Sequence, residues 1–365
     1  MDFGIYLTRI EKELDSSLPQ RADRDWATDS FGPLLDGLDM SHMQPLLDPT
    51  RSLVDLGGKR WRPLLLVLCA ESMAVRSNVD ADCAKENAFH LAPLVEFIHT
   101  ASLIHDDIED RAETRRGKPA AYKTYGLDAA LNAASWLYFQ AATCSDRTTA
   151  TTEMKNMLLG LYTMEARKLH LGQAMDISWH NKKSFFPTRD EYLAMVQCKT
   201  GTLSSLAAKA GTMVAGADMD AVEKAGRAAA KIGAGFQIID DVINLKTGNP
   251  GKIRGDDIVE GKKSLPVLLF IEESGPDSVM AKKLVDCFEH AESEGISSPS
   301  VEAAIKILDE SGAVDRAAKM GSDFIEEGCA DFEKIFGTEN PGAIKIRELF
   351  TAMVPKNCSG EKDHA

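Results

Sequence analysis

The chain has 365 residues, of which 44% are hydrophobic, and this length and composition exclude global disorder and allow a large core. Its formal net charge of −14 is the wrong sign for a general nucleic-acid binder or for a protein that adheres to anionic membranes. Any anionic ligand must therefore be held by local basic residues or by a metal ion, because the overall field repels it.

The cysteines and the apolar runs indicate which cellular compartment the sequence suits. The seven cysteines are odd in number and form no CxxC pair, which indicates neither a disulfide framework nor a zinc site and favours a reducing compartment. The longest apolar run, residues 64–70, is far shorter than the roughly 20 residues that cross a bilayer. We expect a cytoplasmic protein with no membrane span and no nucleic-acid partner.

The first segment with chemical character is GGKRWRP at residues 57–63, directly before an apolar helix. Glycine lets the backbone approach a ligand closely. Lys59, Arg60 and Arg62 then stand at the start of a helix, where the macrodipole also favours anions. This pattern predicts an anion-binding site.

A long helix is predicted over 89–105, and an acidic cluster, DDIED at 106–110, closes it. Residues four apart share a helix face, so Asp106 and Asp110 are expected to project together. The cluster is followed by RRGKP at 115–119, whose arginine side chains suit phosphate oxygens.

The second half repeats this combination of acidic and basic segments. KTG at 199–201 precedes an Ala- and Gly-rich helix predicted over 221–241, and this helix runs into DDVIN at 240–244. The first and last residues of that cluster share a face. A loop rich in Gly, Lys and Asp is predicted over 246–263 and is a candidate mobile lid.

Elsewhere the sequence predicts helices and loops. A capping-box pattern at 188–191 starts one helix, and a Ser-Pro pair at 298–299 starts another that ends near Gly312. A loop is expected over 178–187. No run of alternating β-branched residues bounded by hairpin turns is present in the sequence, so we predict an all-α fold.

Two acidic clusters that faced one cavity would repel each other, by about 4 kcal/mol per pair at ~4 Å and an effective dielectric near 20. A cation is therefore expected between them. No CxxC or His-x-x-x-His pattern lies nearby, and hard carboxylate oxygens suit Mg²⁺, which completes its shell with waters and substrate phosphates. The basic segments around both clusters indicate two diphosphate sites, one bound through Mg²⁺ and one bound directly by Lys and Arg.

Taken singly, each motif has an ordinary explanation, since a lone DDxxD is mostly a solvated helix end. Their order and spacing are more specific, and together they resemble the trans-isoprenyl diphosphate synthases of the polyprenyl synthetase family, most of all the geranylgeranyl diphosphate synthases of the eukaryotic type. The matching segments are GGKRWRP (57–63), EFIHTASLIHDDIED (96–110), RRGKP (115–119), GQAMD (172–176), KTG (199–201), GFQIIDDVIN (235–244) and EGKKSLP (260–266).

The resemblance implies a single all-α domain over 1–355, the isoprenoid synthase fold, in which about ten or more helices surround a deep central cavity. Residues 356–365 are expected to form a disordered polar tail. Members of the family usually form homodimers, and the same is expected here.

The implied reaction is head-to-tail condensation. Isopentenyl diphosphate attacks the carbocation of an allylic diphosphate (dimethylallyl, geranyl or farnesyl), and diphosphate is released. About three Mg²⁺ ions per site would be held by carboxylates, and the implied metal ligands are Asp106, Asp110 and Asp240. The implied catalytic residues are Asp106, Asp107, Lys199, Thr200, Gln237 and Asp240.

The resemblance also implies which residues contact the substrates. The departing diphosphate would be stabilised by Arg115, Lys199 and Lys262. Isopentenyl diphosphate would be held without metal by Lys59, Arg62, His99 and Arg116. The carbocation would be stabilised by Thr200 and Gln237.

Product length needs a steric floor, because a growing chain gains about 0.8 kcal/mol for each buried CH₂. Ala101 and Ser102, just before the first acidic cluster, are small and therefore predict a deeper floor. The deeper candidates Tyr138, Phe139 and His170 resemble the floor of the eukaryotic-type 20-carbon enzymes. The favoured product is geranylgeranyl diphosphate.

Three alternatives stay open. A farnesyl or longer polyprenyl diphosphate synthase would share the same motifs. A class I terpene cyclase would carry an N-D-x-x-S-x-x-x-E second metal site and would not need the basic segment at 57–63. A non-catalytic regulatory subunit would have lost acidic ligands, whereas both clusters here are usable.

Asn244 ends the second acidic cluster. It is a weaker Mg²⁺ ligand than Asp, so an outer-shell role is expected for it.

Overall fold

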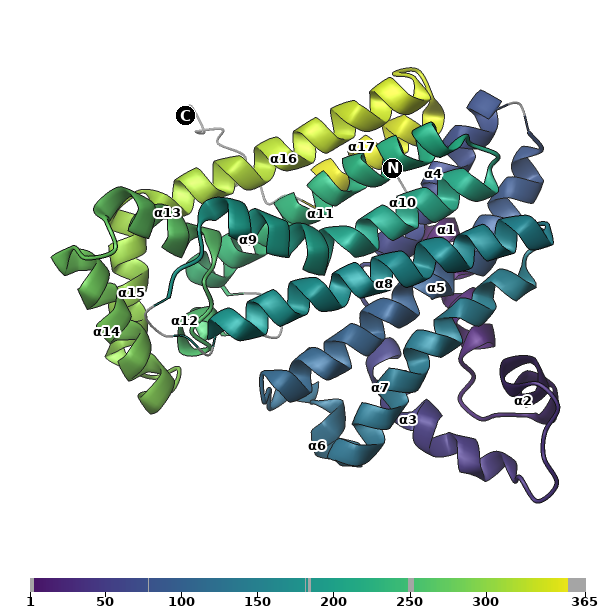
Figure 1. Ribbon diagram of the computed structural model, residues 1–365, viewed down its shortest axis with the longest axis horizontal. Helices are drawn as coiled ribbons and strands as arrows, with labels where there is room; N and C mark the ends of the chain where they lie inside the picture. Colours follow the sequence, from purple (N-terminus) through teal and green to yellow (C-terminus); the bar gives the residue numbers. More distant parts are fainter. Residues whose placement is uncertain (1–2, 78, 181, 183–184, 249–252, 354–365) are drawn as a thin grey trace. The chain divides into compact units, whose positions relative to one another are not determined.

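The structure, a computed structural model, describes residues 3–77, 79–180, 182, 185–248 and 253–353 (Figure 1). Within these residues the chain forms helices α1 to α17, and the strands are only two residues long. The all-α prediction is confirmed. No described helix combines the length and the apolarity that crossing a membrane requires.

Packing divides the chain into two compact units, which we describe separately. Unit 1 contains the residues up to Ala166, Leu206–Gly226 and Ile335–Ile346. Unit 2 contains Arg167–Ser205, Arg227–Lys334 and the residues from Arg347 onward. The single domain over 1–355 and its central cavity stay predictions, and the tail over 356–365 lies outside the described residues.

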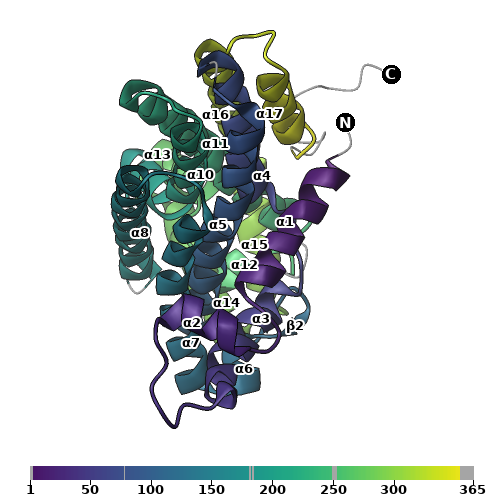
Figure 2. The ribbon, with the colours of Figure 1, turned by 90° about the vertical axis from the view of Figure 1, so that its right-hand side faces the viewer.

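Unit 1 is organised around the long helix α5 (Ala81–Glu109), which packs against α1, α4 and α7 (Figure 2). Most apolar side chains of α5 are buried, and Asp80 caps its N-terminus. The helix extends beyond the predicted range 89–105 at both ends. The other elements lying wholly in this unit are α1 (Gly4–Ser17), α2 (Arg24–Phe31), η1 (Met40–Met43), α3 (Gln44–Val54), α4 (Trp61–Ser77), α6 (Ala121–Tyr125), α7 (Leu127–Ala142) and η2 (Thr143–Arg147).

A small hairpin follows α5, in which β1 (Thr114–Arg115) pairs antiparallel with β2 (Lys118–Pro119). Its two turn residues, Arg116 and Gly117, have φ values of 52° and 75°, as a type I′ turn requires. Arginine rarely adopts this left-handed backbone, so the turn is strained. The sequence predicts no strand here, because two-residue strands are too short to show alternation.

Unit 2 contains two helices that lie side by side, α14 (Val279–Glu294) and α15 (Pro299–Glu310) (Figure 1). Its other elements are α9 (Arg189–Val196), the π-helical segment η3 (Gln197–Gly201), α12 (Asp256–Val259) and α13 (Leu265–Ser274). Five helices have residues in both units: α8 (Thr152–His180), α10 (Thr202–Val214), α11 (Met219–Lys246), α16 (Ala313–Phe336) and α17 (Pro341–Thr351).

Several local predictions for this half are confirmed. Thr188 and Glu191 cap each other reciprocally at the start of α9, and Ser298 caps α15, which begins at Pro299. Two loop predictions are wrong in part. Helix α8 continues through His180, into the loop expected over 178–187, and α12 occupies part of the loop expected over 246–263. The lid role of that second loop stays a prediction.

The π-helical turn η3 depends on a glycine of α8. A Cβ on Gly172 would lie 2.4 Å from the backbone nitrogen of Lys199 and 2.8 Å from the carbonyl carbon of Cys198. Gly201, the last residue of η3, is similarly close to α11, since its Cβ would meet the carbonyl oxygen of Ala230 at 3.0 Å. Both neighbours are backbone atoms, which cannot move aside as a flexible side chain can. These glycines therefore let three segments of unit 2 pack backbone to backbone.

This packing predicts the effect of Gly172→Ala. The added methyl group must displace the backbone of η3, so the free energy of unfolding should fall by about 1–3 kcal/mol in a chemical denaturation measurement. Gly160→Ala on the same helix is the matched control: nothing lies within 4 Å of its Cβ, and alanine should raise the stability by up to about 1 kcal/mol. Equal effects of the two changes would contradict this account of Gly172.

Candidate functional site

Arg62 is the centre of the predicted ligand-binding residues in unit 1. It lies in the first turn of α4, and its guanidinium lies over the Trp61 ring, 4.3 Å from the ring centroid. Its Nη1 is 3.4 Å from Nε2 of His99 on α5, whereas its Nε is buried without a hydrogen-bond partner among the described residues. A buried donor left unsatisfied costs about 1–3 kcal/mol, so this arrangement favours an incoming anion.

The charges around this pair are mainly positive. Burial lowers the pKa of Arg62 to about 10; Glu96 opposes this shift and Arg116 adds to it. The pKa of His99 lies well below its usual value, because the ring is buried and because Arg62, Arg116 and two further arginines face it. At neutral pH the site therefore presents guanidinium cations beside a neutral imidazole, a set of donors that suits a diphosphate.

Arg116 is brought to this site by the strained hairpin turn. Its Nη1 donates a hydrogen bond to the carbonyl oxygen of Gly57, and a Cβ on Gly58 would lie only 3.2 Å from its Nη2. The glycine pair therefore lets the guanidinium lie against the backbone. Lys59 follows in the same segment and is exposed. Three of the four residues predicted to bind isopentenyl diphosphate thus cluster, and Lys59 lies at the surface.

Arg60 has a different role from its neighbours. It is buried, and its guanidinium forms ion pairs with Glu96 at 2.6 Å and with Glu11 at 2.8 Å. It also donates a hydrogen bond to the carbonyl oxygen of Val54. The charge of Arg60 therefore ties α1 and α5 to the segment before α4 and is not directed to the anion site, where the sequence pattern grouped it.

The aspartates of the first acidic cluster lie in two different environments. Asp107 is 1% exposed and accepts two hydrogen bonds from Arg115, from Nε at 2.8 Å and from Nη2 at 2.5 Å. Asp106 is half-buried and lies 3.6 Å from the same Nη2. Asp110 is the half-buried C-cap of α5. Asp107 therefore anchors Arg115, while Asp106 and Asp110 lie on the more open side of the helix end.

The second acidic cluster, near the end of α11 in unit 2, divides its aspartates in the same way. Asp240 is exposed, whereas Asp241 is buried and accepts hydrogen bonds from the Tyr192 hydroxyl at 2.7 Å and from Gln237 Nε2 at 3.0 Å. Thr200 Oγ1 donates to Gln237 Oε1 at 2.9 Å, so the two residues predicted to stabilise a carbocation belong to one hydrogen-bond chain. Burial, helped by neighbouring carboxylates, raises the pKa of Asp241 to about 7.

Asn244, the last residue of the second cluster, is buried. Its Oδ1 accepts a hydrogen bond from the backbone N–H of Asp257 at 3.3 Å, and its Nδ2 is buried with no partner among the described residues. Lys262, which follows α12, lies 3.3 Å from Asp257 Oδ1 and 2.5 Å from Glu260 Oε2. Asn244 thus ties α12 to the cluster, and its outer-shell role toward a metal stays a prediction.

Lys199 is held by a carboxylate that the sequence analysis did not single out. Its Nζ lies 2.6 Å from Asp176 Oδ2 on α8. Burial alone would raise the pKa of Asp176, but Lys199 and His180 hold it well below its usual value. The available signal was the position of Asp176 at the end of the GQAMD segment. The π-helical turn that carries Lys199 and Thr200 is a feature found often at functional sites.

The residues predicted to limit product length are not all in one environment. In unit 1, Ala101 is buried, and Tyr138 on α7 is buried against the ring of His105, with ring centroids 5.6 Å apart. Phe139 is 76% exposed, so the described residues leave most of its ring uncovered. His170 lies in unit 2 and is exposed. The structure therefore supports Tyr138 as an interior residue and leaves Phe139 and His170 on surfaces. The Ser102 hydroxyl donates a hydrogen bond to the carbonyl oxygen of His99 in its own helix.

The donors present fit Mg²⁺ better than a tightly caged metal. No group of three or more His, Cys, Asp or Glu side chains among the described residues is arranged as a metal site. The predicted ligands are hard carboxylate oxygens on open or half-buried sides of their helices. Mg²⁺ is usually bound in this way, by one or two carboxylates together with waters and substrate phosphates. That the ligands of units 1 and 2 share the same ions stays a prediction.

Three of the proteins that this chain resembles illustrate its similarity to known enzymes. A geranylgeranyl diphosphate synthase from Methanosarcina mazei is 33% identical over 293 residues, which are 80% of this chain and 84% of that protein. A geranylfarnesyl diphosphate synthase from Natronomonas pharaonis is also 33% identical over 293 residues, 78% of this chain and 82% of that protein. The crystal structure of a geranylgeranyl pyrophosphate synthetase from Pyrococcus horikoshii matches with a TM-score of 0.78 and 26% identity, over 98% of this chain and 97% of that one.

The three relatives named above are archaeal, so the likeness to the eukaryotic type stays a prediction.

A match to a family model shows which family the chain belongs to. The model of the polyprenyl synthetase family matches residues 43–303, well over half of the chain, and the matched range contains both acidic clusters and the basic segments at 57–63, 115–119, 199–201 and 260–266. The chain therefore belongs to the polyprenyl synthetase family of prenyltransferases.

Proposed function

We propose that this protein condenses isopentenyl diphosphate with allylic diphosphates in a Mg²⁺-dependent reaction, with geranylgeranyl diphosphate as the favoured product. One observation carries the proposal: Arg62 has a buried Nε with no hydrogen-bond partner and forms no ion pair among the described residues, beside His99 and Arg116. A terpene cyclase binds a single diphosphate and has no need of this second, metal-free site. A regulatory subunit has no need of open carboxylates at Asp106, Asp110 and Asp240.

In the proposed reaction one C–O bond breaks and one C–C bond forms. The C–O bond of the allylic diphosphate breaks, and its electron pair leaves with the diphosphate. Asp106, Asp110 and Asp240 would hold Mg²⁺, which would neutralise the charge of that leaving group, and Arg115, Lys199 and Lys262 would add to this stabilisation. The π electrons of isopentenyl diphosphate form the new C–C bond, and the departed diphosphate takes the proton that is lost. Thr200 has committed its hydroxyl proton to Gln237, so its oxygen lone pairs remain available to the developing carbocation.

The product length rests on the interior position of Tyr138. Its ring is buried on α7 and contacts the ring of His105, and the backbone that carries it accepts a hydrogen bond from the Tyr162 hydroxyl. A fixed ring at this depth is a steric stop, because close-packed interiors resist intrusion. The relatives include both a geranylgeranyl and a geranylfarnesyl synthase, so a 25-carbon product is the close alternative.

A homodimer is supported by apolar side chains that the single chain leaves exposed. Within unit 1 they occur on α7 and on the first half of α8, and they are Leu127, Leu131, Phe139, Met157, Leu159 and Met164. Exposed apolar side chains on α7 and α8, which touch where the Tyr162 hydroxyl bonds the Tyr138 carbonyl oxygen, support a protein interface. A second copy packed on α7 would also cover Phe139. Sedimentation equilibrium should give twice the mass of the chain, and Leu131→Glu with Phe139→Glu should reduce it to a monomer.

The metal assignment predicts the effect of neutral substitutions. Asp106→Asn and Asp240→Asn each remove an anionic ligand, so kcat for condensation should fall by about 100-fold or more. Chelation of divalent ions should abolish the reaction, and added Mg²⁺ should restore it. Asp36→Asn, at an exposed loop residue, is the control and should leave kcat unchanged. Wild-type turnover by both metal-site variants would overturn the assignment.

The floor predicts the effect of Tyr138→Ala. Removal of the ring opens space below the cavity, so mass analysis of the products should show a shift from 20 carbons to 25 or more. Tyr138→Phe keeps the ring and should keep the distribution. Tyr125→Ala, at a partly exposed tyrosine of α6, is the control. An unchanged product distribution in Tyr138→Ala would remove this residue from the floor.

A further inference from the structure

The indole of Trp61 supports the guanidinium of Arg62 from one face. Arg62 Cζ lies 4.3 Å from the centroid of the Trp61 ring, inside the roughly 6 Å limit of a cation–π contact. Side chains at neighbouring helix positions point in different directions and do not normally meet. The contact therefore requires the Arg62 side chain to bend back across its neighbour.

Trp61 itself has a well-defined position. It is the first residue of α4, and its side chain is buried. The residue before it, Arg60, has a φ of 46°, a backbone conformation that residues other than glycine rarely adopt. The buried side chain of Arg60 is anchored by ion pairs with Glu11 and Glu96. The indole therefore offers Arg62 a surface whose place is set by the segment before α4.

A ring stabilises a guanidinium differently from a carboxylate. A carboxylate accepts hydrogen bonds from the N–H groups at the edge of the guanidinium, as Asp107 does from Arg115. A ring contacts the flat face and leaves the N–H groups at the edge available to another acceptor. In this way the cation of Arg62 is stabilised although its buried Nε has no hydrogen-bond partner among the described residues.

Glu96 is the carboxylate that competes with this arrangement. It acts on Arg62, since it opposes the lowering of the pKa that burial causes. Glu96 is buried on α5 and already forms an ion pair with Arg60 at 2.6 Å. Without the indole, the Arg62 side chain could turn toward this carboxylate or toward solvent. Its donors would then have to be ordered again when a ligand binds, which costs affinity.

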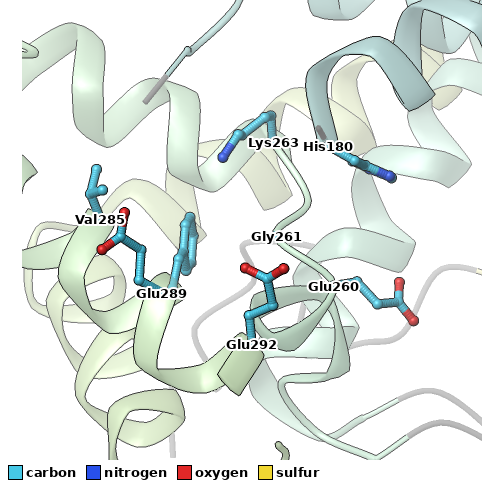
Figure 3. A pocket seen from close by; sticks show the side chains of 8 residues that line it. His180, Glu260, Gly261, Lys263, Val285, Glu289 and Glu292 are labelled. Atoms are coloured by element: carbon cyan, nitrogen blue, oxygen red, sulfur yellow. The ribbon is translucent and has the colours of Figure 1, made fainter. Parts of the chain in front are cut away.

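Lys263 in unit 2 shows that an aromatic contact alone does not keep a cation available for an anion. Its Nζ lies 4.9 Å and 5.4 Å from the centroids of two phenylalanine rings. Three glutamates line the same small pocket, and Figure 3 shows Glu289 and Glu292 across it from Lys263. These carboxylates would repel an anion. Arg62 differs because it has a ring on its face and forms no ion pair among the described residues.

We propose that Trp61 is a positioning residue, which holds the guanidinium of Arg62 by its face so that the N–H groups at the edge are set for the diphosphate of isopentenyl diphosphate. The inference rests on the proposed function, in which Arg62 belongs to the metal-free diphosphate site. It goes further by making the affinity for one substrate depend on a side chain that acts through its neighbour. An aliphatic residue cannot replace the indole, because only an aromatic face attracts a cation in this way.

The test removes the aromatic face in two steps, with Trp61→Phe and Trp61→Leu. KM and kcat are measured for each substrate while the other is saturating. Trp61→Leu should raise KM for isopentenyl diphosphate by about tenfold, and Trp61→Phe by about threefold, because phenylalanine is a weaker cation–π partner than tryptophan. KM for geranyl diphosphate and kcat should stay within about twofold of wild type, since the loss affects the binding of one substrate.

A double-mutant cycle shows whether Trp61 acts through Arg62. In an Arg62→Gln background the ring has no cation to hold, so Trp61→Leu should leave kcat/KM for isopentenyl diphosphate unchanged. The same change should lower kcat/KM by about tenfold when Arg62 is present. Equal losses in the two backgrounds would give Trp61 a purely structural role and overturn the proposal.

Loss of a buried ring also lowers stability, so a second tryptophan provides the matched control. Trp26 on α2 donates a hydrogen bond to the carbonyl oxygen of Ser17 and contacts two other aromatic rings. Trp26→Leu should lower the melting temperature and leave KM for isopentenyl diphosphate unchanged. If Trp61→Leu does not fold, Trp61→Met decides, because its flexible side chain fills space without offering an aromatic face. Wild-type KM in that variant would count against the proposal.

Direct binding distinguishes failure of this inference from failure of the proposed function. Isopentenyl diphosphate is titrated into the protein in EDTA and followed by calorimetry, so that neither metal nor turnover contributes. The Kd of Trp61→Leu should be about tenfold higher than that of wild type. If wild type condenses no substrates, the proposed function fails. If wild type condenses them but Kd and KM are the same in both proteins, the inference about Trp61 fails and the proposed function stands.

Discussion

A buried guanidinium that lacks a partner for one of its donors is the constraint on which the interpretation of this chain depends. In a protein with a formal charge of −14, carboxylates are plentiful, and most buried cations in the described residues have acquired them. Arg60 is paired with Glu96, and Arg115 with Asp107. The Nε of Arg62 has no such partner, although Glu96 is close enough to affect its pKa. Among the described residues Arg62 thus lacks the ion pairs that tie Arg60 and Arg115 into the fold.

The acidic clusters follow the same division. In each pair of adjacent aspartates, the second residue is buried and bonded: Asp107 to Arg115, and Asp241 to Tyr192 and Gln237. Adjacent residues on a helix point about 100° apart, so both cannot face the same ligand. Asp107 therefore fits a positioning role, through the arginine that it holds, better than a direct part in catalysis. One aspartate of each pair supports the site, and the other is left on the open side of the helix.

Much of the fold could be predicted from the sequence because it depends on local patterns. Helical spacing, the capping box at 188–191 and the Ser-Pro helix start at 298–299 need only neighbouring residues to be recognised. The hairpin at 114–119 could not be predicted because its two-residue strands are too short to show alternation. The π-helical turn η3 could not be predicted because it packs backbone to backbone against distant segments. The same holds for the candidate site. Motif order predicted which residues belong to it, but the pairing of Asp176 with Lys199 and the burial of Arg60 against Glu96 depend on tertiary packing.

The strained turn at Arg116 has a consequence for the order of events when an anion arrives. Its backbone already occupies a conformation that arginine seldom adopts in a flexible loop, and the hairpin register and the contact with Gly57 hold it there. The energy of bending the chain is therefore spent during folding and not at the moment of encounter. An anion bound here, as we propose, would meet a guanidinium whose direction is already set, so less of the attraction between them would be lost in ordering a mobile arm.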